Sequence, residues 1–313
     1  MGKSILPSIK NSDGKRYTAA QPVYNLTSLS QLSSFARYKF THRDFNAHMF
    51  RWAHTALVIN ALRLAKKGNL LDVGCGVNKD QMLALSSNWA PPRLYVGLDA
   101  RAQAPSTRTV GFPTDFVQHD LTEPFPAFED DEGEVKWDII VCYEVLEHMP
   151  KAMGIKLLDN IRAVCGPKTL VLFSTPCFDA DAWMAENHIY EWGHEELKEE
   201  LLKRWNIKDH FGTFASQKDY QHMLHPEVIK AFDRLKKFYG SNIISNLAGP
   251  LFPCQSRNTL WHLTTPDGQL EMDFESVNAD MEAKPALTEH PESRPDAYDG
   301  EHKETEVAAE QPE

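Results

Sequence analysis

The sequence lacks any apolar run that approaches the roughly 18 residues of a membrane-spanning helix. Residues 1–17 contain no apolar segment of the kind found in secretory signals, and Leu6 stands where N-myristoylation requires Ser or Thr. Cysteine is scarce as well. The five cysteines form no CxxC pair, so neither a disulfide framework nor a zinc knuckle is indicated. We therefore expect a soluble, cytoplasmic protein that has no membrane partner.

Positive charge is also in short supply, because 33 Lys and Arg face 44 Asp and Glu, a formal net charge of −11. The imbalance lies at one end of the chain. Residues 266–313 hold 15 acidic and 3 basic residues, a formal charge of −12, and the rest of the chain is close to neutral at +1. The composition therefore does not exclude RNA or another nucleic acid as a partner of that neutral part. Apolar residues are sparse in residues 266–313, which predicts an acidic, disordered tail.

Three parts are expected along the chain. Residues 1–34 are polar with little periodicity and should be mobile or loosely packed, residues 35–265 should form one domain, and residues 266–313 the tail. Within the domain, short apolar segments alternate with helical periodicities, which is typical of a doubly wound α/β fold with a mostly parallel sheet and helices on both faces. The expected strands are 70–73, 94–98, 115–118, 138–142, 169–173, 207–214 and 259–263.

Two segments have more than one interpretation. Residues 216–250 form a helix-rich insertion between the last two expected strands, with a helix over 226–239. This insertion is a packed excursion, a wall of the acceptor pocket or an oligomer surface. Residues 37–52 mix basic and aromatic side chains just before the first strand. They predict either a clamp for a nucleotide or a lid helix over the cofactor.

The most informative motif is Asp72-Val-Gly74-Cys-Gly76, directly after the first apolar strand. Glycines at that point let the backbone turn sharply and approach a ligand that a side chain would block. Asp99 ends the next strand about 23 residues later, where a carboxylate can accept both hydroxyl groups of an adenosine ribose. The third strand is followed by Asp120, an acid suited to the adenine amino group. The sequence therefore predicts a nucleoside site at the carboxyl edge of a parallel sheet.

A dinucleotide fingerprint would need a third glycine, but Lys79 occupies that position. SAM (S-adenosylmethionine) has no pyrophosphate and does not need that close approach to the helix. The segments LLDVGCG, VGLDA, HDL and WDIIVCYEVLEH together resemble the successive motifs of class I SAM-dependent methyltransferases. A Rossmann-like domain that binds NAD or nothing is the alternative.

The resemblance covers roughly residues 35–265 and implies an enzyme with SAM as cofactor. It also implies a seven-stranded Rossmann-like sheet whose last strand is antiparallel. The cofactor-binding residues that it implies are Asp72, Gly74 and Gly76 by the methionine end, Asp99 on the ribose, Asp120 with Leu121 on the adenine, and Cys142, Tyr143 and Glu144 around the transferred methyl group.

Candidate catalytic residues follow the fourth and fifth strands. Glu144, Glu147 and His148 would share one face if their segment is helical, and His188 lies further along the chain. His148 and His188 are the predicted general bases. The ExxEH pattern and His188 in the HxxEW segment are similar to those of the small-RNA 3′-terminal 2′-O-methyltransferases. That resemblance implies, as an alternative, a Mg²⁺ or Mn²⁺ site made of Glu144, Glu147, His148 and His188. A metal-free His/Glu active site and purely structural roles stay open.

The leading hypothesis is methyl transfer from SAM to oxygen or nitrogen of a small metabolite or modified nucleotide. One alternative is a metal-assisted RNA 2′-O-methyltransferase, and another is a SAM-binding subunit without catalysis of its own. The Asp/Asn-Pro-Pro-aromatic motif of exocyclic-amine DNA methyltransferases is absent after the fourth strand, and so is a Pro-Cys nucleophile. The sequence specifies neither the acceptor nor the oligomeric state.

Overall fold

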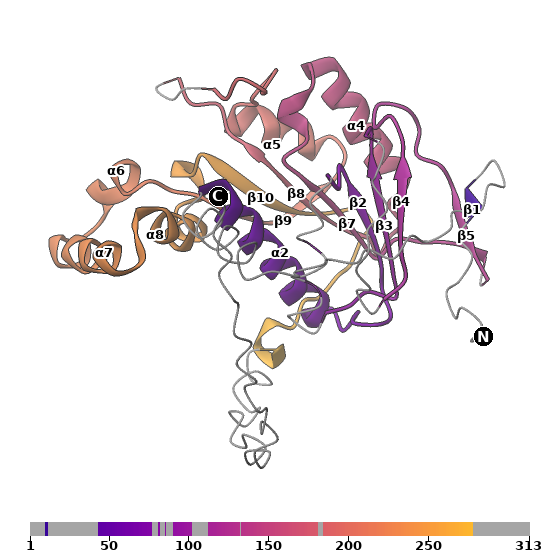
Figure 1. Cartoon of the computed structure of the whole chain (residues 1–313), viewed down its shortest axis with the longest axis horizontal. Helices are drawn as coiled ribbons and strands as arrows, with labels where there is room; N and C mark the ends of the chain where they lie inside the picture. The colour runs from indigo at the N-terminus through magenta and orange to yellow at the C-terminus, as the bar shows by residue number, and fades with distance from the viewer. Residues whose placement is uncertain are drawn as a thin grey trace, which may run out of the picture. The chain divides into compact units, whose positions relative to one another are not determined.

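The computed structural model describes residues 10–11, 43–76, 81, 85, 90–101, 112–131, 133–180 and 184–277. The described residues divide into two units, with the boundary between Phe274 and Glu275. In the first unit, seven strands form one sheet in the order β4-β3-β2-β7-β8-β10-β9 (Figure 1). The strands of this sheet are β2 (Asn69–Val73), β3 (Leu94–Asp99), β4 (Thr114–Gln118), β7 (Ile139–Tyr143), β8 (Leu170–Pro176), β9 (Asn206–Gly212) and β10 (Asn258–Thr264).

Strand direction agrees with the prediction. The pairs β2·β3, β3·β4, β2·β7 and β7·β8 are parallel, whereas β10 is antiparallel to both of its neighbours, β8 and β9. The expected seven-stranded, mostly parallel sheet with an antiparallel last strand is therefore confirmed.

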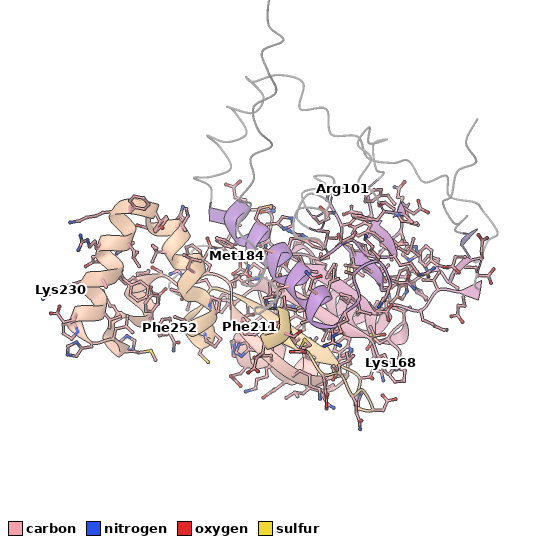
Figure 2. All side chains as sticks on the ribbon, turned by 90° about the horizontal axis from the view of Figure 1, so that it is seen from below. Arg101, Lys168, Met184, Phe211, Lys230 and Phe252 are labelled. Carbon is pink, nitrogen blue, oxygen red and sulfur yellow. The ribbon has the colours of Figure 1, made fainter. Side chains whose placement is uncertain are left out.

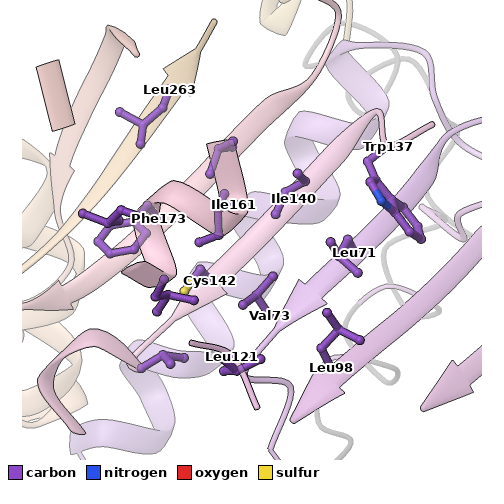
Figure 3. Close-up of a cluster of buried hydrophobic side chains, with 14 of the residues drawn as sticks. Leu71, Val73, Leu98, Leu121, Trp137, Ile140, Cys142, Ile161, Phe173 and Leu263 are labelled. Atoms are coloured by element: carbon purple, nitrogen blue, oxygen red, sulfur yellow. The ribbon is translucent and has the colours of Figure 1, made fainter. Parts of the chain in front are cut away.

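The central strands are apolar throughout because both faces of the sheet are covered. Successive side chains of a strand point to opposite faces, so Leu71 and Val73 join one core cluster and Leu70 joins another. Helices α4 (Lys151–Ala163) and α5 (His194–Leu202) contribute to the first cluster, and α2 (Arg43–Ala61) to the second. Figure 1 shows these helices on opposite sides of the sheet, and Figure 3 shows the first cluster around Leu71, Val73 and Phe173.

A small second sheet was not predicted. It joins β1 (Lys10–Asn11), β5 (Phe128–Asp130) and β6 (Gly133–Glu134) in antiparallel order. These strands have two or three residues each, too few to give a periodicity in the sequence. No helix in the described part of the chain combines the length and the apolar character that a bilayer span requires.

The folded domain continues past Thr265, where the composition changes. Leu270, Met272 and Phe274 pack against the second core cluster, and Arg63 donates a hydrogen bond to Asp273 over 3.3 Å. The sequence analysis missed this extension because acidic residues alternate with the apolar ones, which lowers the local apolar content. Side chains at alternate positions can nevertheless pack on the same side of an extended segment. The remainder of the predicted tail, residues 278–313, lies outside the described residues.

The insertion between β9 and β10 is helical. It contains α6 (Gln217–Tyr220), α7 (Pro226–Tyr239) and α8 (Ser241–Ala248), with short 3₁₀ turns between and after them. Its own small core brings together Ala215, Tyr220 and Ala248, and Tyr220 stacks on Phe252 with ring centroids 4.2 Å apart. Figure 2 shows α7 with Lys230 at the outer end of this insertion, and Phe252 on the side toward the sheet.

Two histidines meet in the second core cluster. Nε2 of His54, in α2, lies 2.8 Å from Nε2 of His262, in β10, so one imidazole donates to the other. Both rings contact Phe211 edge-on. Burial lowers the pKa of His54 to about 4 and that of His262 to about 3. Both imidazoles are therefore neutral in the folded protein at pH 7.

This pair predicts loss of stability in mild acid. Between the ordinary histidine pKa of about 6.5 and the folded value, the unfolded chain binds protons that the folded chain does not, so the free energy of unfolding falls as pH decreases. We expect a loss on the order of 5 kcal/mol between pH 7 and pH 4.5, about half of it from each histidine. The double variant His54→Phe/His262→Leu should show a flatter profile in urea unfolding. Burial raises the pKa of Asp115 to about 7, so this carboxyl makes the free energy of unfolding rise as pH decreases. Its contribution is the same in both proteins and cancels when the two profiles are compared. Superimposable profiles would contradict the assignment.

Candidate functional site

The sheet has its switch point between β2 and β7. From β2 the chain continues to β3 on one side, while β7 lies on the other side, and all three strands are parallel. The segments that follow β2, β3, β7 and β8 therefore leave the same carboxyl edge. Ligands bind in such crevices in open α/β sheets.

The glycine turn after β2 is tightly constrained. Gly74 and Gly76 have φ values of 78° and 62°, and the amides of Gly74 and Cys75 donate to the carbonyl oxygen of Leu98 over 2.8 and 3.0 Å. A Cβ at position 74 would lie 2.2 Å from Cγ2 of Val145. Among the described residues, a Cβ at position 76 would meet the Arg101 side chain alone, at 3.8 Å. Gly74 is thus needed for packing, whereas Gly76 leaves backbone that a ligand can approach.

Asp72 faces the interior. Its carboxylate accepts hydrogen bonds from the hydroxyl of Tyr95 and, over 3.2 Å, from the amide of Gln81, which also donates to the carbonyl of Cys75 over 3.0 Å. Burial, together with the charge of Asp72, raises the pKa of Tyr95. Asp72 therefore supports the glycine turn from inside. The sequence analysis missed Gln81 and Tyr95, because no motif marks an amide or a phenol that holds a turn.

Asp99 stands at the end of β3, beside the turn. Its Oδ2 accepts from the amide of Gly76 over 2.9 Å, and its Oδ1 accepts from the amide and Nε of Arg101 over 2.9 and 3.0 Å. Burial raises the pKa of Asp99, but these hydrogen bonds outweigh it and hold the pKa below its ordinary value. The Arg101 side chain is 64% exposed, so this ion pair is weak and a ligand hydroxyl can displace it.

The adenine-side residues follow β4. Asp120 is exposed and its Oδ1 accepts from the amide and hydroxyl of Thr122, each over 2.9 Å. The hydrogen bonds from Thr122 lower the pKa of Asp120. Leu121 is buried in the first core cluster. These residues share the carboxyl edge with Gly76 and Asp99.

Of the three residues expected around the methyl group, Glu144 is the one that lines the cavity described below. Cys142 is fully buried in the first core cluster, and Tyr143 lies under α2 with its hydroxyl 2.7 Å from that of Thr55. Alternation along β7 directs Cys142 and Tyr143 to opposite faces, and both faces are covered. The expectation that both line the pocket therefore does not match the structure.

Glu144 has an unusual backbone. Its φ is 56°, in the left-handed region that non-glycine residues rarely occupy and that often marks functional sites. Two distant hydrogen bonds hold its carboxylate: Ser174 donates to Oε1 over 2.9 Å and Asn258 to Oε2 over 2.6 Å. A 3₁₀ turn, η1 (Leu146–His148), follows. The predicted common face of Glu144, Glu147 and His148 requires one continuous helix. The left-handed backbone of Glu144 prevents such a helix, so the prediction does not hold.

Glu147 is almost completely buried at the floor of the site. Its Oε2 accepts from the hydroxyl of Thr175 over 3.1 Å, and its carbonyl accepts from the amide of Ile189 over 2.7 Å. Burial and the nearby charge of Glu144 raise the pKa of Glu147 well above its ordinary range. The backbone contact with residue 189 also brings the segment after β8 to the ExxEH segment.

Two imidazoles face each other there, with ring centroids 5.3 Å apart. Nδ1 of His148 lies 2.9 Å from the carbonyl oxygen of Asn187, and Nδ1 of His188 lies 2.5 Å from Oε1 of Glu191. Both oxygens accept, so each neutral ring carries its proton on Nδ1 and leaves Nε2 as an acceptor. One donor atom each from Glu147, His148 and His188 lies within 4.8 Å of the other two. Glu144 does not join this group.

These groups line a cavity of about 380 Å³, a volume suited to a small ligand. A second cavity of about 510 Å³ shares Cys177, Asp179 and Arg257 with the first and continues along the insertion. The insertion therefore contributes to the wall of the site. The residues of the first cavity that matter for its chemistry are His48, Arg51, Glu144, Glu147, His148, His188, Glu191, Arg257 and Asn258.

The sheet order, the glycine turn and the acid at the end of β3 belong to a Rossmann-like α/β fold with a cavity at the carboxyl edge of its sheet. The sequence matches the family described as a methyltransferase domain over residues 45–226. The chain belongs to this methyltransferase family. No curated protein sequence matches it.

Several solved structures have similar folds at low identity. The 1,6-didemethyltoxoflavin-N1-methyltransferase of Burkholderia thailandensis, with 1,6-didemethyltoxoflavin and S-adenosylhomocysteine bound, is 15% identical, with a TM-score of 0.45 over 85% of this chain and 98% of that one. A SAM-dependent methyltransferase of Archaeoglobus fulgidus is 15% identical, with a TM-score of 0.43 over 76% and 100%. The small RNA methyltransferase HEN1 is 14% identical, with a TM-score of 0.43 over 71% and 26%.

The Gly74 contact gives a testable prediction. We expect Gly74→Ala to lower the free energy of unfolding by about 3 kcal/mol or more, because positive φ and the Val145 overlap both oppose a Cβ. Gly240→Ala is the control: φ is 83° and ψ is 157° there, a region that other residues avoid, but no described atom lies within 4 Å of the added Cβ, so a loss of about 1–2 kcal/mol from backbone strain alone is expected. Adding Val145→Ala to Gly74→Ala should recover part of the loss in urea unfolding. Equal losses in the two single glycine variants would refute the packing argument.

Proposed function

We propose that this methyltransferase uses SAM and transfers the methyl group to an oxygen or nitrogen of a small metabolite or modified nucleotide bound in the 380 Å³ cavity. The observation that carries the proposal is the placement of two imidazoles, each with Nε2 free to accept a proton, beside a glycine turn and a ribose-type carboxylate at one sheet edge.

The cofactor side fits an adenosyl group. The backbone at Gly76 is open, and Asp99 presents a low-pKa carboxylate whose Arg101 partner is exposed and displaceable. Asp120 offers a further acceptor at the neighbouring strand end. When bound, SAM supplies an electrophilic methyl group on a sulfonium. Gly74, Gly76, Asp99, Asp120 and Leu121 are the residues that would hold it.

The reaction side fits an acceptor that must lose a proton. Glu191 and the carbonyl of Asn187 fix the tautomers of His188 and His148, so either Nε2 can take a proton from an acceptor O–H or N–H. The cavity walls would orient the acceptor for in-line attack. The carboxyl of Glu147, whose pKa burial raises, lies at the floor of the cavity, while Glu144 positions the loop through Ser174 and Asn258.

Asp99 provides the first test. We expect Asp99→Ala to weaken SAM and S-adenosylhomocysteine binding by about tenfold to a hundredfold in calorimetry, because two hydrogen bonds to a charged acceptor are lost. Asp159→Ala is the control, since Asp159 is an exposed acid on α4 that pairs with Arg204. Undiminished affinity in Asp99→Ala, or no affinity in the unaltered protein, would overturn the cofactor assignment.

His188 provides the second test, by transfer of labelled methyl from SAM to RNA, DNA and metabolite pools. We expect His188→Gln to lower the transfer rate by about a hundredfold or more with SAM affinity unchanged, because the proton acceptor is removed. Glu191→Gln should have a smaller effect, since Nδ1 keeps a hydrogen-bond partner. Unchanged transfer in His188→Gln would exclude it as the base, and absence of transfer to any pool would favour a non-catalytic SAM-binding subunit.

A second candidate is a metal-assisted RNA 2′-O-methyltransferase. Two imidazoles and a buried carboxylate within 4.8 Å of one another suit a divalent cation such as Mn²⁺ or Mg²⁺. A bound cation would favour the ionised form of Glu147 and offset the cost of burying that charge. It would also act as a Lewis acid on an acceptor hydroxyl. Glu144 fits less well because both of its oxygens already accept hydrogen bonds.

Chelation separates the two candidates. For the leading proposal, transfer should persist in EDTA, and Mn²⁺ should show no tight binding in calorimetry. Transfer that is lost in EDTA and restored by Mn²⁺ or Mg²⁺, together with Mn²⁺ binding abolished in Glu147→Gln, would favour the metal-assisted enzyme instead.

A further inference from the structure

Helix α2 carries a buried arginine at the reaction cavity. Ala47, His48 and Arg51 follow one another at helical spacing and line that cavity, while Trp52 and Ala56 pack on the sheet. Arg51 is 3% exposed. The face of α2 that carries Ala47, His48 and Arg51 therefore places the Arg51 guanidinium beside Glu144.

Two nitrogens of this guanidinium make no hydrogen bond. Nε and Nη1 of Arg51 are buried and have no hydrogen-bond partner. Oε1 of Glu144 lies 3.7 Å from Nη1, too far for a hydrogen bond, and both Glu144 oxygens already accept from Ser174 and Asn258. The Tyr143 ring, 5.9 Å from Cζ, is at the outer limit of a cation–π contact. Burying charged N–H donors without hydrogen bonds lowers the stability of the fold. A ligand that accepts hydrogen bonds from Arg51 would supply the missing partners.

Arg257 and His188 have nearer carboxylate partners than Arg51 has, although Nε of Arg257 also lacks a hydrogen-bond partner. Arg257 pairs with Asp179 over 3.3 Å and lies 3.9 Å from Asp219, and His188 pairs with Glu191. Among the described residues that line the cavity, Arg51 is thus the cation whose hydrogen-bonding capacity is least satisfied.

We infer that Arg51 binds an anionic group, a carboxylate or phosphate, of the methyl acceptor, whose reactive oxygen or nitrogen then lies by His148 and His188. This inference rests on the proposed function. The cavity lining contains none of Gly74, Gly76 or Asp99, so Arg51 faces the acceptor side. A planar guanidinium fork matches two oxygens of such an anion, whereas a neutral acceptor leaves its donors unsatisfied.

Anion binding tests the inference directly on the full chain loaded with S-adenosylhomocysteine. The probes are benzoate and phenyl phosphate, with benzamide as a neutral match, titrated by ligand-detected NMR. We expect the unaltered protein to bind at least one anion and not benzamide, and Arg51→Met to weaken that binding by about tenfold or more. Arg63→Met is the control, because Arg63 lies just beyond the same helix and is exposed.

Stability of the unliganded protein gives a second measurement. Replacing a buried guanidinium that lacks hydrogen bonds by an apolar side chain of similar length should leave the melting temperature unchanged or higher. A merely structural Arg51–Glu144 pair would instead require a lower melting temperature in Arg51→Met, and that result would overturn the inference.

Two further outcomes would overturn it. One is equal binding of the anions to Arg51→Met and the unaltered protein. The other is loss of SAM affinity in Arg51→Met, which would assign the guanidinium to the carboxylate of the cofactor. If the unaltered protein has no SAM affinity, the proposed function fails, and the same anion titration on the unloaded protein still decides the role of Arg51.

Discussion

The contact between Gly74 and Val145 sets the geometry of the whole site. The segments after β2 and β7 meet only because position 74 has no side chain, since a Cβ there would overlap Cγ2 of Val145 at 2.2 Å. Gly74 belongs to the glycine turn after β2. Val145 directly follows Glu144, whose backbone is left-handed. One steric contact thus joins the glycine turn to the segment that carries Glu144, Glu147 and His148.

Hydrogen bonds from the sheet then orient the reacting groups. Ser174 at the end of β8 and Asn258 at the start of β10 hold Glu144, and Thr175 holds Glu147. His148 and His188 each receive their tautomer from a fixed acceptor. Because these supports come mainly from strand ends, the cavity is organised before any ligand arrives, which lowers the reorganisation needed during the reaction.

Features that depend on neighbours in the chain could be predicted from the sequence. The apolar strands, the glycine turn and Asp99 follow from local pattern, and the meeting of His148 with His188 follows from the rule that parallel strands end at one edge. The backbone of Glu144 could not be predicted, because it depends on partners 30 and 114 residues away. Burial of Cys142 depends on helices that cover the sheet, and the unsatisfied state of Arg51 depends on which oxygens Glu144 has already engaged.

The position of β10 has a consequence for how this site can diversify. β10 is hydrogen-bonded on both sides, so its first residue, Asn258, returns to Glu144 whatever the chain does after Gly212. Residues 213–257 are therefore a loop closed at both ends by the sheet, and lengthening such a loop adds only a slowly growing entropic cost. Residues 213–257 can therefore change in sequence and length, and with them the lining of the second cavity, while Asn258 keeps its hydrogen bond to Glu144. Substrate selectivity could then evolve separately from catalysis.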